Sequence, residues 1–202
     1  IYGDLGKIYT SLENFPLADY YLSIMEADFD KIVPINRFLT LSDRAHYYEL
    51  KEEYEKALVQ RKKAYDIVQS FENLESNAEA EASLAKVYLH LNQPDSAKVY
   101  LDKSAMYLFQ TEDFSSETYY LEGLFAVYYM QKKNLEQAEY FLSKRPISRT
   151  FYPSHILSHL TLREELNVKR NNYQKAYEYT KKSGIYKDSI ASATVQNNIA
   201  EP

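Results

Sequence analysis

One stretch of the sequence decides the fold: AEAEASLAKVYLHLNQPDSAKVYLDKSA, residues 78–105. Ala85 and Tyr88 lie on one face of a helix, because residues three apart in a helix are neighbours. Asn92 interrupts the apolar pattern, and Pro94 suits the first turn of a second helix, where its missing N–H costs nothing. The stretch therefore predicts a pair of helices joined by a short turn.

The second helix of this pair recurs along the chain. An alanine that follows a turn and an aromatic or apolar residue occurs five times, at intervals of 39, 40, 41 and 38 residues. These alanines are Ala18, Ala57, Ala97, Ala138 and Ala176. A nearly constant interval of this size indicates an array of structural repeats.

Two further columns accompany the alanines. Twelve residues before each of the first four stands another small residue, and three residues after that comes a tyrosine. The small residues are Gly6, Ala45, Ala85 and Ala126, and the tyrosines are Tyr9, Tyr48, Tyr88 and Tyr129. Two helices approach to about 8–10 Å only where a side chain at their crossing is small. We expect the small columns to meet within each pair, and the tyrosine rings to fill the space between neighbouring repeats.

The composition agrees with a helical array. Only 4 residues are Gly and 6 are Pro, a balance that suits helices and disfavours tight turns. We predict an all-α protein, an α–α superhelix of about five helix-turn-helix repeats with a period near 40 residues, in a single domain over residues 1–202. The expected repeats cover residues 1–30, 37–72, 77–110, 115–146 and 153–184, and residues 185–202 form a C-terminal helical segment.

These columns resemble the tetratricopeptide repeat, whose two helices carry Leu-Gly/Ala-x-x-Tyr and Tyr-x-x-Ala. The matching residues are Leu5-Gly6-x-x-Tyr9 with Phe15-x-x-Ala18, Ala45-x-x-Tyr48 with Tyr54-x-x-Ala57, Leu84-Ala85-x-x-Tyr88 with Pro94-x-x-Ala97, and Phe125-Ala126-x-x-Tyr129 with Leu135-x-x-Ala138. The resemblance covers almost the whole chain. It implies a solenoid whose first helices line a groove that binds protein or peptide.

Two features depart from that family. The period is near 40 residues rather than the usual 34, so we expect longer loops at residues 30–36 and 144–153. The fifth unit has Glu164 and Asn167 where a small residue and a tyrosine are expected. This predicts either a first helix that is shifted by a residue or a capping role for the unit.

The end of the chain carries a second resemblance. Ser183-Gly184 is typical of a helix C-terminus, so we expect the last repeat to stop there. Tyr186-Lys187-Asp188-Ser189-Ile190 resembles the segment that closes the repeat array in Bacteroidetes-type tetratricopeptide signalling and transcriptional regulators. That resemblance implies the sensory or interaction part of a bacterial regulator, with a membrane span and a DNA-binding or kinase module downstream. It slightly favours a periplasmic over a cytoplasmic location.

Charge and composition disfavour several classes of function. The net charge of −5 argues against nucleic-acid binding, which depends on Lys and Arg neutralising phosphates. No apolar run reaches the ~20 residues of a membrane helix and no signal segment opens the chain, so we expect a soluble segment without membrane contact. The chain contains no Cys, which excludes disulfides and thiolate metal sites. It opens at Ile1 as if inside a helix, and we interpret it as part of a longer protein.

No motif predicts catalysis or a cofactor. His155 and His159 are four residues apart, as in helical zinc motifs, but Ile156 stands where the accompanying Glu would be. Ser83-x-x-Lys86 lies in the middle of a predicted helix, and the partner motifs of serine-lysine enzymes are missing. No Gly-rich phosphate loop occurs. We predict no enzyme activity, no metal site and no cofactor.

The groove implied by the tetratricopeptide resemblance is the candidate binding site. Its positions are mixed in charge and include Lys7, His46, Glu49, Lys86, His90, Tyr120, Met130, Glu165 and Lys169. The positions at which some members of the family clamp a terminal carboxylate are Gly3, Lys7, Asp43, Glu79 and Ser83, and most have the wrong sign. An internal peptide, a protein surface or a second copy in a homodimer therefore fits better. The alternatives are a sensor of a small ligand, either a peptide or an oligosaccharide stacked on Tyr120, and a structural spacer.

Overall fold

The computed structural model describes residues 2–27, 29–71, 73–110, 115–148 and 150–199. Over these ranges the chain consists of α-helices and one short 3₁₀ helix and contains no strand, which confirms the all-α prediction. None of the helices in these ranges is long and apolar enough to cross a membrane. The chain divides into two compact units, Ile1–Gln110 and Thr111–Pro202.

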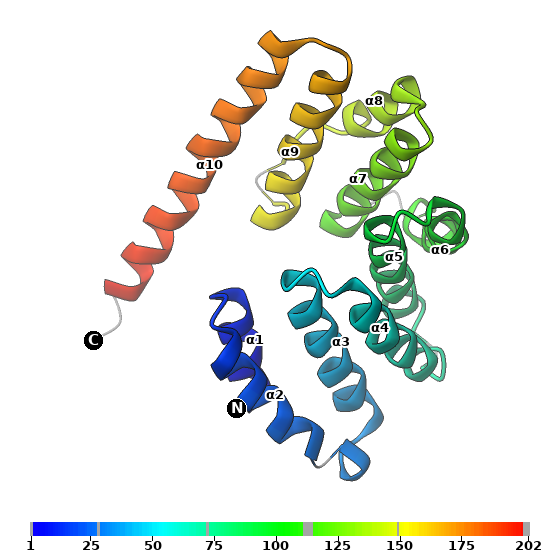
Figure 1. The fold of residues 1–202 in the computed structure, drawn as a ribbon, viewed down its shortest axis with the longest axis vertical. Coiled ribbons are helices and arrows are strands. Elements are labelled where there is room, and N and C mark those ends of the chain that lie inside the picture. The colour runs from blue at the N-terminus through cyan, green and yellow to red at the C-terminus, as the bar shows by residue number, and fades with distance from the viewer. Residues whose placement is uncertain (1, 28, 72, 111–114, 149, 200–202) are drawn as a thin grey trace. The chain divides into compact units, whose positions relative to one another are not determined.

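The first unit contains three successive helix pairs (Figure 1). They are α1 (Tyr2–Ser11) with α2 (Phe15–Ala27), α3 (Pro34–Leu50) with α4 (Tyr54–Val68), and α5 (Leu74–His90) with α6 (Pro94–Leu108), and η1 (Phe29–Lys31) precedes α3. The helix α3 begins at Pro34, inside the segment 30–36 for which the sequence predicts a loop. A proline there starts the helix, because its fixed φ is suitable and its missing N–H is not needed in the first turn.

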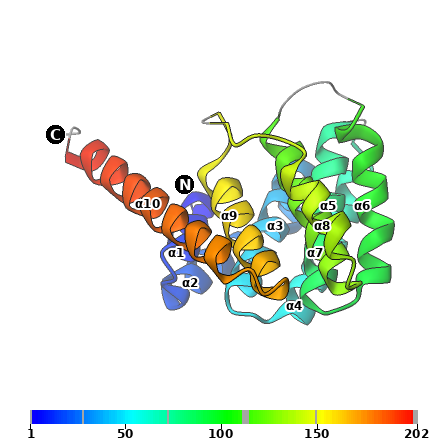
Figure 2. The same cartoon turned by 90° about the horizontal axis from the view of Figure 1, so that it is seen from above.

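The second unit contains two pairs and ends in the longest helix. The helices are α7 (Ser116–Gln131), α8 (Leu135–Ser143), α9 (Pro153–Lys169) and α10 (Tyr173–Ile199). The helix end predicted at Ser183-Gly184 is wrong, because α10 continues through both residues and its far end runs on past α9 (Figure 2). A glycine ends a helix by adopting positive φ, and Gly184 does not adopt it.

The same turn joins the two helices of every pair. One residue in each turn has a left-handed backbone conformation, with φ between 53° and 60°. These residues are Glu13, Glu52, Asn92, Lys133 and Asn171. The N–H of the next residue bonds to the carbonyl five positions earlier, as Gln93 N bonds to Tyr88 O at 2.9 Å. This hydrogen-bond pattern is the Schellman motif, which closes the first helix and reverses the chain.

The turn also establishes the register of the fifth pair. Asn172 N bonds to Asn167 O at 2.8 Å, as Gln93 N bonds to Tyr88 O in the third pair. Asn167 therefore occupies the tyrosine position, and Glu164 occupies the small position. The first helix of the fifth pair is not shifted by a residue.

We expect Glu52→Gly to raise the free energy of unfolding by about 1 kcal/mol, because a Cβ is strained in the left-handed region. The φ of Glu52 is 58°. Urea denaturation of the full chain, followed by circular dichroism, measures the change. Asn92→Gly is the control, and its free energy of unfolding should rise less, because Asn tolerates this conformation better than Glu does. A loss of stability in Glu52→Gly would show that the turn carries no such strain.

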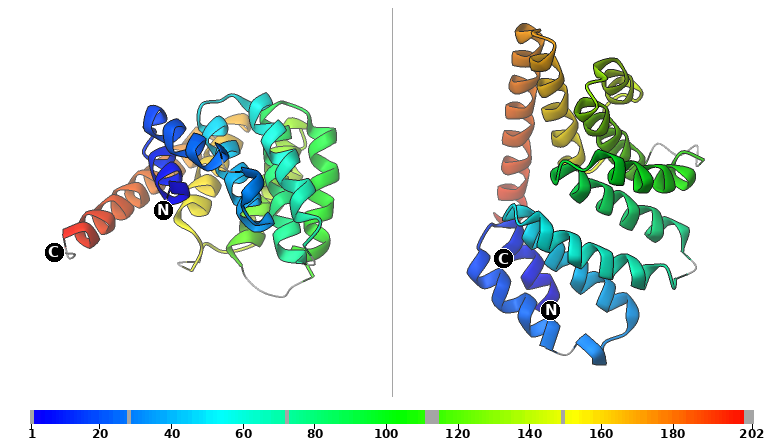
Figure 3. Two further views of the ribbon diagram at one scale, coloured as in Figure 1. Left: turned by 90° about the horizontal axis from the view of Figure 1, so that it is seen from below. Right: turned by 45° about the vertical axis from the view of Figure 1, so that its right-hand side comes forward.

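The two small columns are core positions. Ala18, Ala45, Ala57, Ala85, Ala97, Ala126 and Ala138 have no exposed surface. A Cβ added at Gly6 would lie 2.8 Å from Leu22 Cδ2, so α2 approaches α1 too closely for a larger residue. Figure 3 (right) shows α3 beside α4 and α5 beside α6 as consecutive pairs. Both columns are thus buried, and at Gly6 the two helices of the pair approach closely, as the sequence predicts.

Three of the four column tyrosines stack inside their own helix pair, whereas Tyr48 packs edge-on beside Tyr47, against the cluster that contains Ala18 and Leu22 of the first pair. The stacked rings are Tyr9 on Tyr21 at 5.5 Å, Tyr88 on Tyr100 at 5.6 Å, and Tyr129 on Phe141 at 5.5 Å between ring centroids. The sequence predicts these rings between neighbouring repeats, and this is only partly right. Lys62 of α4 places its ammonium 5.7 Å from the Tyr88 ring, a contact between repeats. The stacking partner itself comes from the second helix of the same pair.

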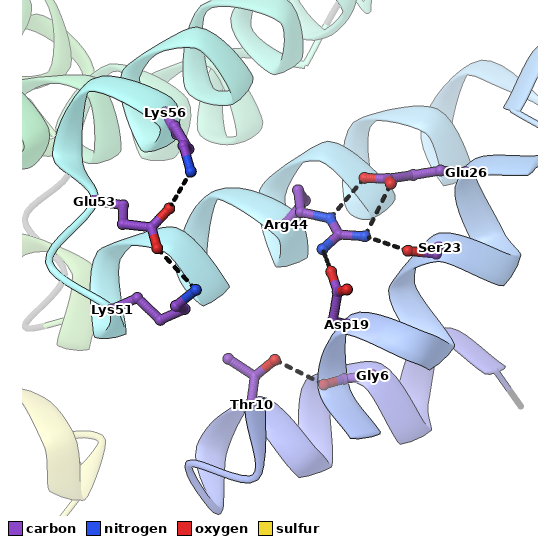
Figure 4. A network of polar contacts seen from close by, with 9 residues as sticks. All are labelled: Gly6, Thr10, Asp19, Ser23, Glu26, Arg44, Lys51, Glu53 and Lys56. Carbon is purple, nitrogen blue, oxygen red and sulfur yellow. Dashed lines mark hydrogen bonds and ion pairs between the residues drawn. The ribbon is translucent and has the colours of Figure 1, made fainter. Parts of the chain in front are cut away.

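A buried arginine joins the first pair to the second (Figure 4). Arg44 of α3 is 3% exposed and donates hydrogen bonds to three residues of α2: Asp19 Oδ1 at 2.5 Å, Ser23 Oγ at 3.1 Å, and the Glu26 carboxylate at 2.7 and 2.9 Å. Burial by itself would lower the pKa of Arg44, but the two carboxylates outweigh burial and raise it. The guanidinium therefore stays charged inside the repeat interface. Nothing in the repeat pattern indicated this contact.

Candidate functional site

Five of the predicted groove residues lie on the first helices of the first unit. They are Lys7 on α1, His46 and Glu49 on α3, and Lys86 and His90 on α5. His46 and Glu49 are three apart and Lys86 and His90 are four apart, so each pair shares a helix face. We call the surface formed by α1, α3 and α5 the first-helix face.

Glu49 is an internal anchor on this face. It is 6% exposed, and its carboxylate contacts Arg61 of α4 and Lys86 of α5, each at 2.8 Å. Burial by itself would raise the pKa of Glu49, but Arg61 and Lys86 outweigh burial and hold the pKa at about 2. Glu49 therefore links the second repeat to the third and offers little surface to a partner.

The pKa of each of the two histidines beside Glu49 is lowered. Burial lowers the pKa of both His46 and His90 below the usual 6.5, and the Lys86 charge lowers both further. The ring of His90 stacks on Tyr54 of α4, with the centroids 4.5 Å apart and the planes 7° apart. These surroundings therefore favour the neutral form of both imidazoles.

Two hollows of about 230 Å³ each lie along the first-helix face, and Leu39 and Asp43 of α3 line both. One is completed by residues of α1, α2 and α3, including Asp4 and Met25. The other is completed by residues of α1, α3, α4 and α5. Leu39 is 49% exposed, so an accessible apolar side chain and a carboxylate belong to the lining of both hollows. We call them the Asp43 hollows.

Asp43 is a half-buried carboxylate with no hydrogen bond or ion pair to another residue in the described part of the chain. Burial raises its pKa to about 6, although Lys7 and Arg61 lower it and Asp4 raises it. Desolvating a carboxylate costs free energy unless a cation or a donor compensates it. A ligand that brings such a group to Asp43 would supply this compensation.

The carboxylate-clamp positions meet around these hollows. Lys7, Asp43, Glu79 and Ser83 line one hollow and Gly3 lines the other. The sequence missed two residues of the site, Leu39 and Arg61. Leu39 could have been found from its position four residues before Asp43 on the same helix. Arg61 lies on a second helix, so the groove positions of the family did not point to it.

The remaining predicted groove residues belong to the second unit. Tyr120 of α7 stacks on His155 of α9 at 4.7 Å between centroids, and Glu165 pairs with Lys169 at 3.2 Å one turn along α9. Met130 is 6% exposed and packs in the core with Ala126, Ala138, Leu142 and Leu166. Met130 thus contributes to packing, and we leave it out of the proposed binding surface.

The histidine and serine motifs have structural partners. His159 is 1% exposed, its Nε2 lies 2.5 Å from Tyr119 O, and burial lowers its pKa to about 3. His155 Nδ1 lies 2.8 Å from Ser116 Oγ. Within the described ranges no group of three His, Cys, Asp or Glu could hold a metal ion. Lys86 of the serine-lysine motif pairs with Glu49, at 2.8 Å between Nζ and Oε2.

No model of a protein family matches the chain, and no curated protein is significantly similar to it in sequence. Solved structures do share its fold. BtubC (BKLC) from P. vanneervenii is 14% identical with a TM-score of 0.67, over 93% of this chain and 78% of that chain. A putative kinesin light chain from Podosopora anserina with nearly identical TPR-like repeats is 16% identical with a TM-score of 0.63, over 94% of each chain.

A third similar structure is the apo form of the quorum sensor NprR from B. thuringiensis. It is 16% identical with a TM-score of 0.62, over 88% of this chain and 52% of that chain. Identities this low establish the fold alone. Together with the helix pairs, they confirm that the chain is a tetratricopeptide-type helical repeat solenoid.

Proposed function

We propose that this chain is a non-catalytic scaffold that binds a peptide or protein segment on the first-helix face of the first unit. One observation carries the proposal: two hollows beside α1, α3 and α5 share Leu39 and Asp43, and the Asp43 carboxylate has no hydrogen bond or ion pair among the described residues. Grooves on stacked helix pairs suit extended segments, since successive side chains reach successive repeats.

The hollows favour a segment with a Lys or Arg next to an apolar residue. The side chains that face Asp43 are Asp4 and Lys7 from α1, Arg61 from α4 and Glu79 from α5. Arg61 is held by Glu49, so the carboxylates predominate around Asp43. A basic side chain would pair with Asp43 while its apolar neighbour covered the exposed Leu39.

The wider role that we propose is the sensory or interaction part of a bacterial signalling or transcriptional regulator. The Tyr186–Ile190 resemblance supports it, and one structure of the same fold is a quorum sensor. Binding would act by favouring one arrangement of the repeats, or a homodimer, over another, because a ligand shifts an equilibrium only through its differential affinity.

The test is a selection with the full chain from a random-peptide phage library. We expect the enriched peptides to carry a Lys or Arg beside an apolar residue. Fluorescence anisotropy with one enriched peptide then gives its Kd. Asp43→Asn should weaken binding roughly tenfold, a loss of about 1.4 kcal/mol. In the wild type the affinity should fall as the pH drops through about 6, because protonation removes the Asp43 charge.

Asp66→Asn is the matched control, since Asp66 is an exposed carboxylate on α4 and lines neither Asp43 hollow. It makes the same chemical change and should leave the Kd within about twofold. If the enriched peptides bound Asp43→Asn and the wild type equally well, the first-helix face would not be the binding site. A structural spacer would yield no enriched sequence at all.

A small-ligand sensor is the second candidate. A hollow of about 730 Å³ between α4, α5 and α6 favours it, because Tyr65, Met106 and Tyr107 line it and small-molecule sites have this size. Tyr65 donates to Glu81 Oε1 at 3.1 Å, so the aromatic wall carries a polar end. In this case Tyr107→Ala, and not Asp43→Asn, would abolish ligand binding.

A further inference from the structure

A hollow in the second unit lies at the end of its shortest helix, α8. That helix has 9 residues, whereas α4 and α6 each have 15. The chain leaves α8 at Ser143, and a hollow of about 420 Å³ lies against the end of α8, the loop that follows it, α9 and α10. Two arginines line this hollow, Arg145 from the loop and Arg163 from α9. We call it the Arg163 hollow.

Arg145 is held in place by a buried carboxylate. Its Nε donates to Glu122 Oε1 at 2.8 Å, and Glu122 of α7 has no exposed surface. Lys144 approaches the same oxygen at 3.7 Å. The buried Glu122 thus holds Arg145 Nε at the wall of the hollow.

Arg163 is anchored at one nitrogen only. Its Nη2 donates to Leu142 O in the last turn of α8. The guanidinium carbon lies 5.9 Å from the centre of the Tyr179 ring of α10, a position that keeps the group over the hollow. Its Nε and Nη1 have no acceptor among the described residues. A guanidinium has five N–H groups in a planar fork, so several remain for a ligand.

The side chains around this hollow are mainly positive, although the chain as a whole is acidic. The residues that line it include Arg145 and Arg163 and one carboxylate, Glu139, which is paired with Arg170. The whole chain carries −5. Pro146 and Leu166 complete the wall with apolar surface. Positive charge thus gathers where an apolar wall is also present.

We propose that the Arg163 hollow binds a small organic anion, with a carboxylate or phosphate group held by Arg163 and Arg145 and an apolar part against Pro146 and Leu166. A guanidinium matches the two oxygens of either group with two parallel hydrogen bonds. The volume exceeds the need of an inorganic ion and admits an organic group of a few carbon atoms. This site belongs to the second unit, and its proposal does not rest on peptide binding at the first-helix face.

Isothermal titration of the full chain in chloride buffer tests the proposal with two probes, phenyl phosphate and benzoate. The two probes share a phenyl ring and differ in the anionic group. The probe that binds more tightly therefore shows whether the site prefers a phosphate or a carboxylate. Phenol, which has the ring without the anionic group, is the negative probe. We expect saturable binding of at least one anion and none of phenol. Absence of binding by both anions would overturn the proposal.

Arg163→Gln should weaken the binding at least tenfold. Lys175→Gln removes the same charge from an exposed side chain of α10 that does not line the hollow, and it should change the affinity less than twofold. Equal weakening by both variants would show a general charge effect and would overturn the site. If Arg163→Gln does not fold, NMR of the wild type replaces it. Phenyl phosphate must then shift arginine Nε–H resonances, and unshifted resonances would equally overturn the site.

Discussion

Arg145→Met is expected to lower the free energy of unfolding of the second unit by about 3 kcal/mol near neutral pH, because removing one partner of a buried ion pair leaves an uncompensated charge. Glu122 stays fully buried in the variant, and its only remaining cation among the described residues is Lys144, at 3.7 Å and half-exposed. Urea denaturation followed by circular dichroism measures the loss. Lys144→Met, which removes the weaker partner, is the control and should cost less than about 1 kcal/mol.

The loss should depend on pH with a definite sign. Burial raises the pKa of Glu122 above its usual value even though Arg145 and Lys144 lower it, and without Arg145 it must rise further. A carboxyl whose folded pKa is raised contributes stability below its unfolded pKa and loses it as the pH rises through the folded value. The deficit of Arg145→Met should therefore shrink toward pH 4.5, the usual value for Glu. A deficit that did not change with pH, or that Glu122→Gln failed to relieve, would assign the loss to packing.

Ala97→Leu is expected to cost about 3 kcal/mol, because extra methylene groups in a close-packed core force side chains and backbone apart. Ala97 has no exposed surface, and it occupies the column at which the helices of a pair cross. Any outward movement of α6 also strains the Schellman turn at Asn92, five residues earlier. The urea midpoint of the full chain should fall.

Ser96→Leu is the neighbouring control. Ser96 is exposed on α6, so the same leucine adds surface without a clash and should change the stability by less than about 0.5 kcal/mol. If Ala97→Leu were as well tolerated as Ser96→Leu, the small column would not mark the helix crossing. The periodic alanines would then reflect helix propensity alone.

Local patterns in the sequence predicted most of the fold. The alanine column, the small column twelve residues earlier and the intervening turns each depend on contacts inside one helix pair, and such contacts repeat at a constant spacing. The predicted helix end at Gly184 is wrong, and the reason lies in the geometry of the turn. A Schellman turn needs a left-handed residue, and the chain places Glu, Lys or Asn there in every turn, whereas Gly184 stays helical.

The candidate site was only partly predictable. The groove positions of the family pointed to Lys7, His46 and Lys86. They also pointed to Glu49, although its carboxylate is enclosed by two cations and is not an exposed contact residue. Whether a charged residue faces a partner or anchors a repeat depends on residues about 12 and 37 positions away. No single-helix pattern carries that information.

The sequence by itself determined the helix pairs, their turns and the small columns where paired helices cross, because each depends on residues within one repeat. Only the tertiary structure decided the rest: the Asp43 hollows, the ion network at Glu49, and the hollow at the end of α8 beside Arg145 and Arg163. The reason is physical. Desolvation and charge pairing depend on every group that packs around an atom, and in a solenoid those groups come from neighbouring repeats.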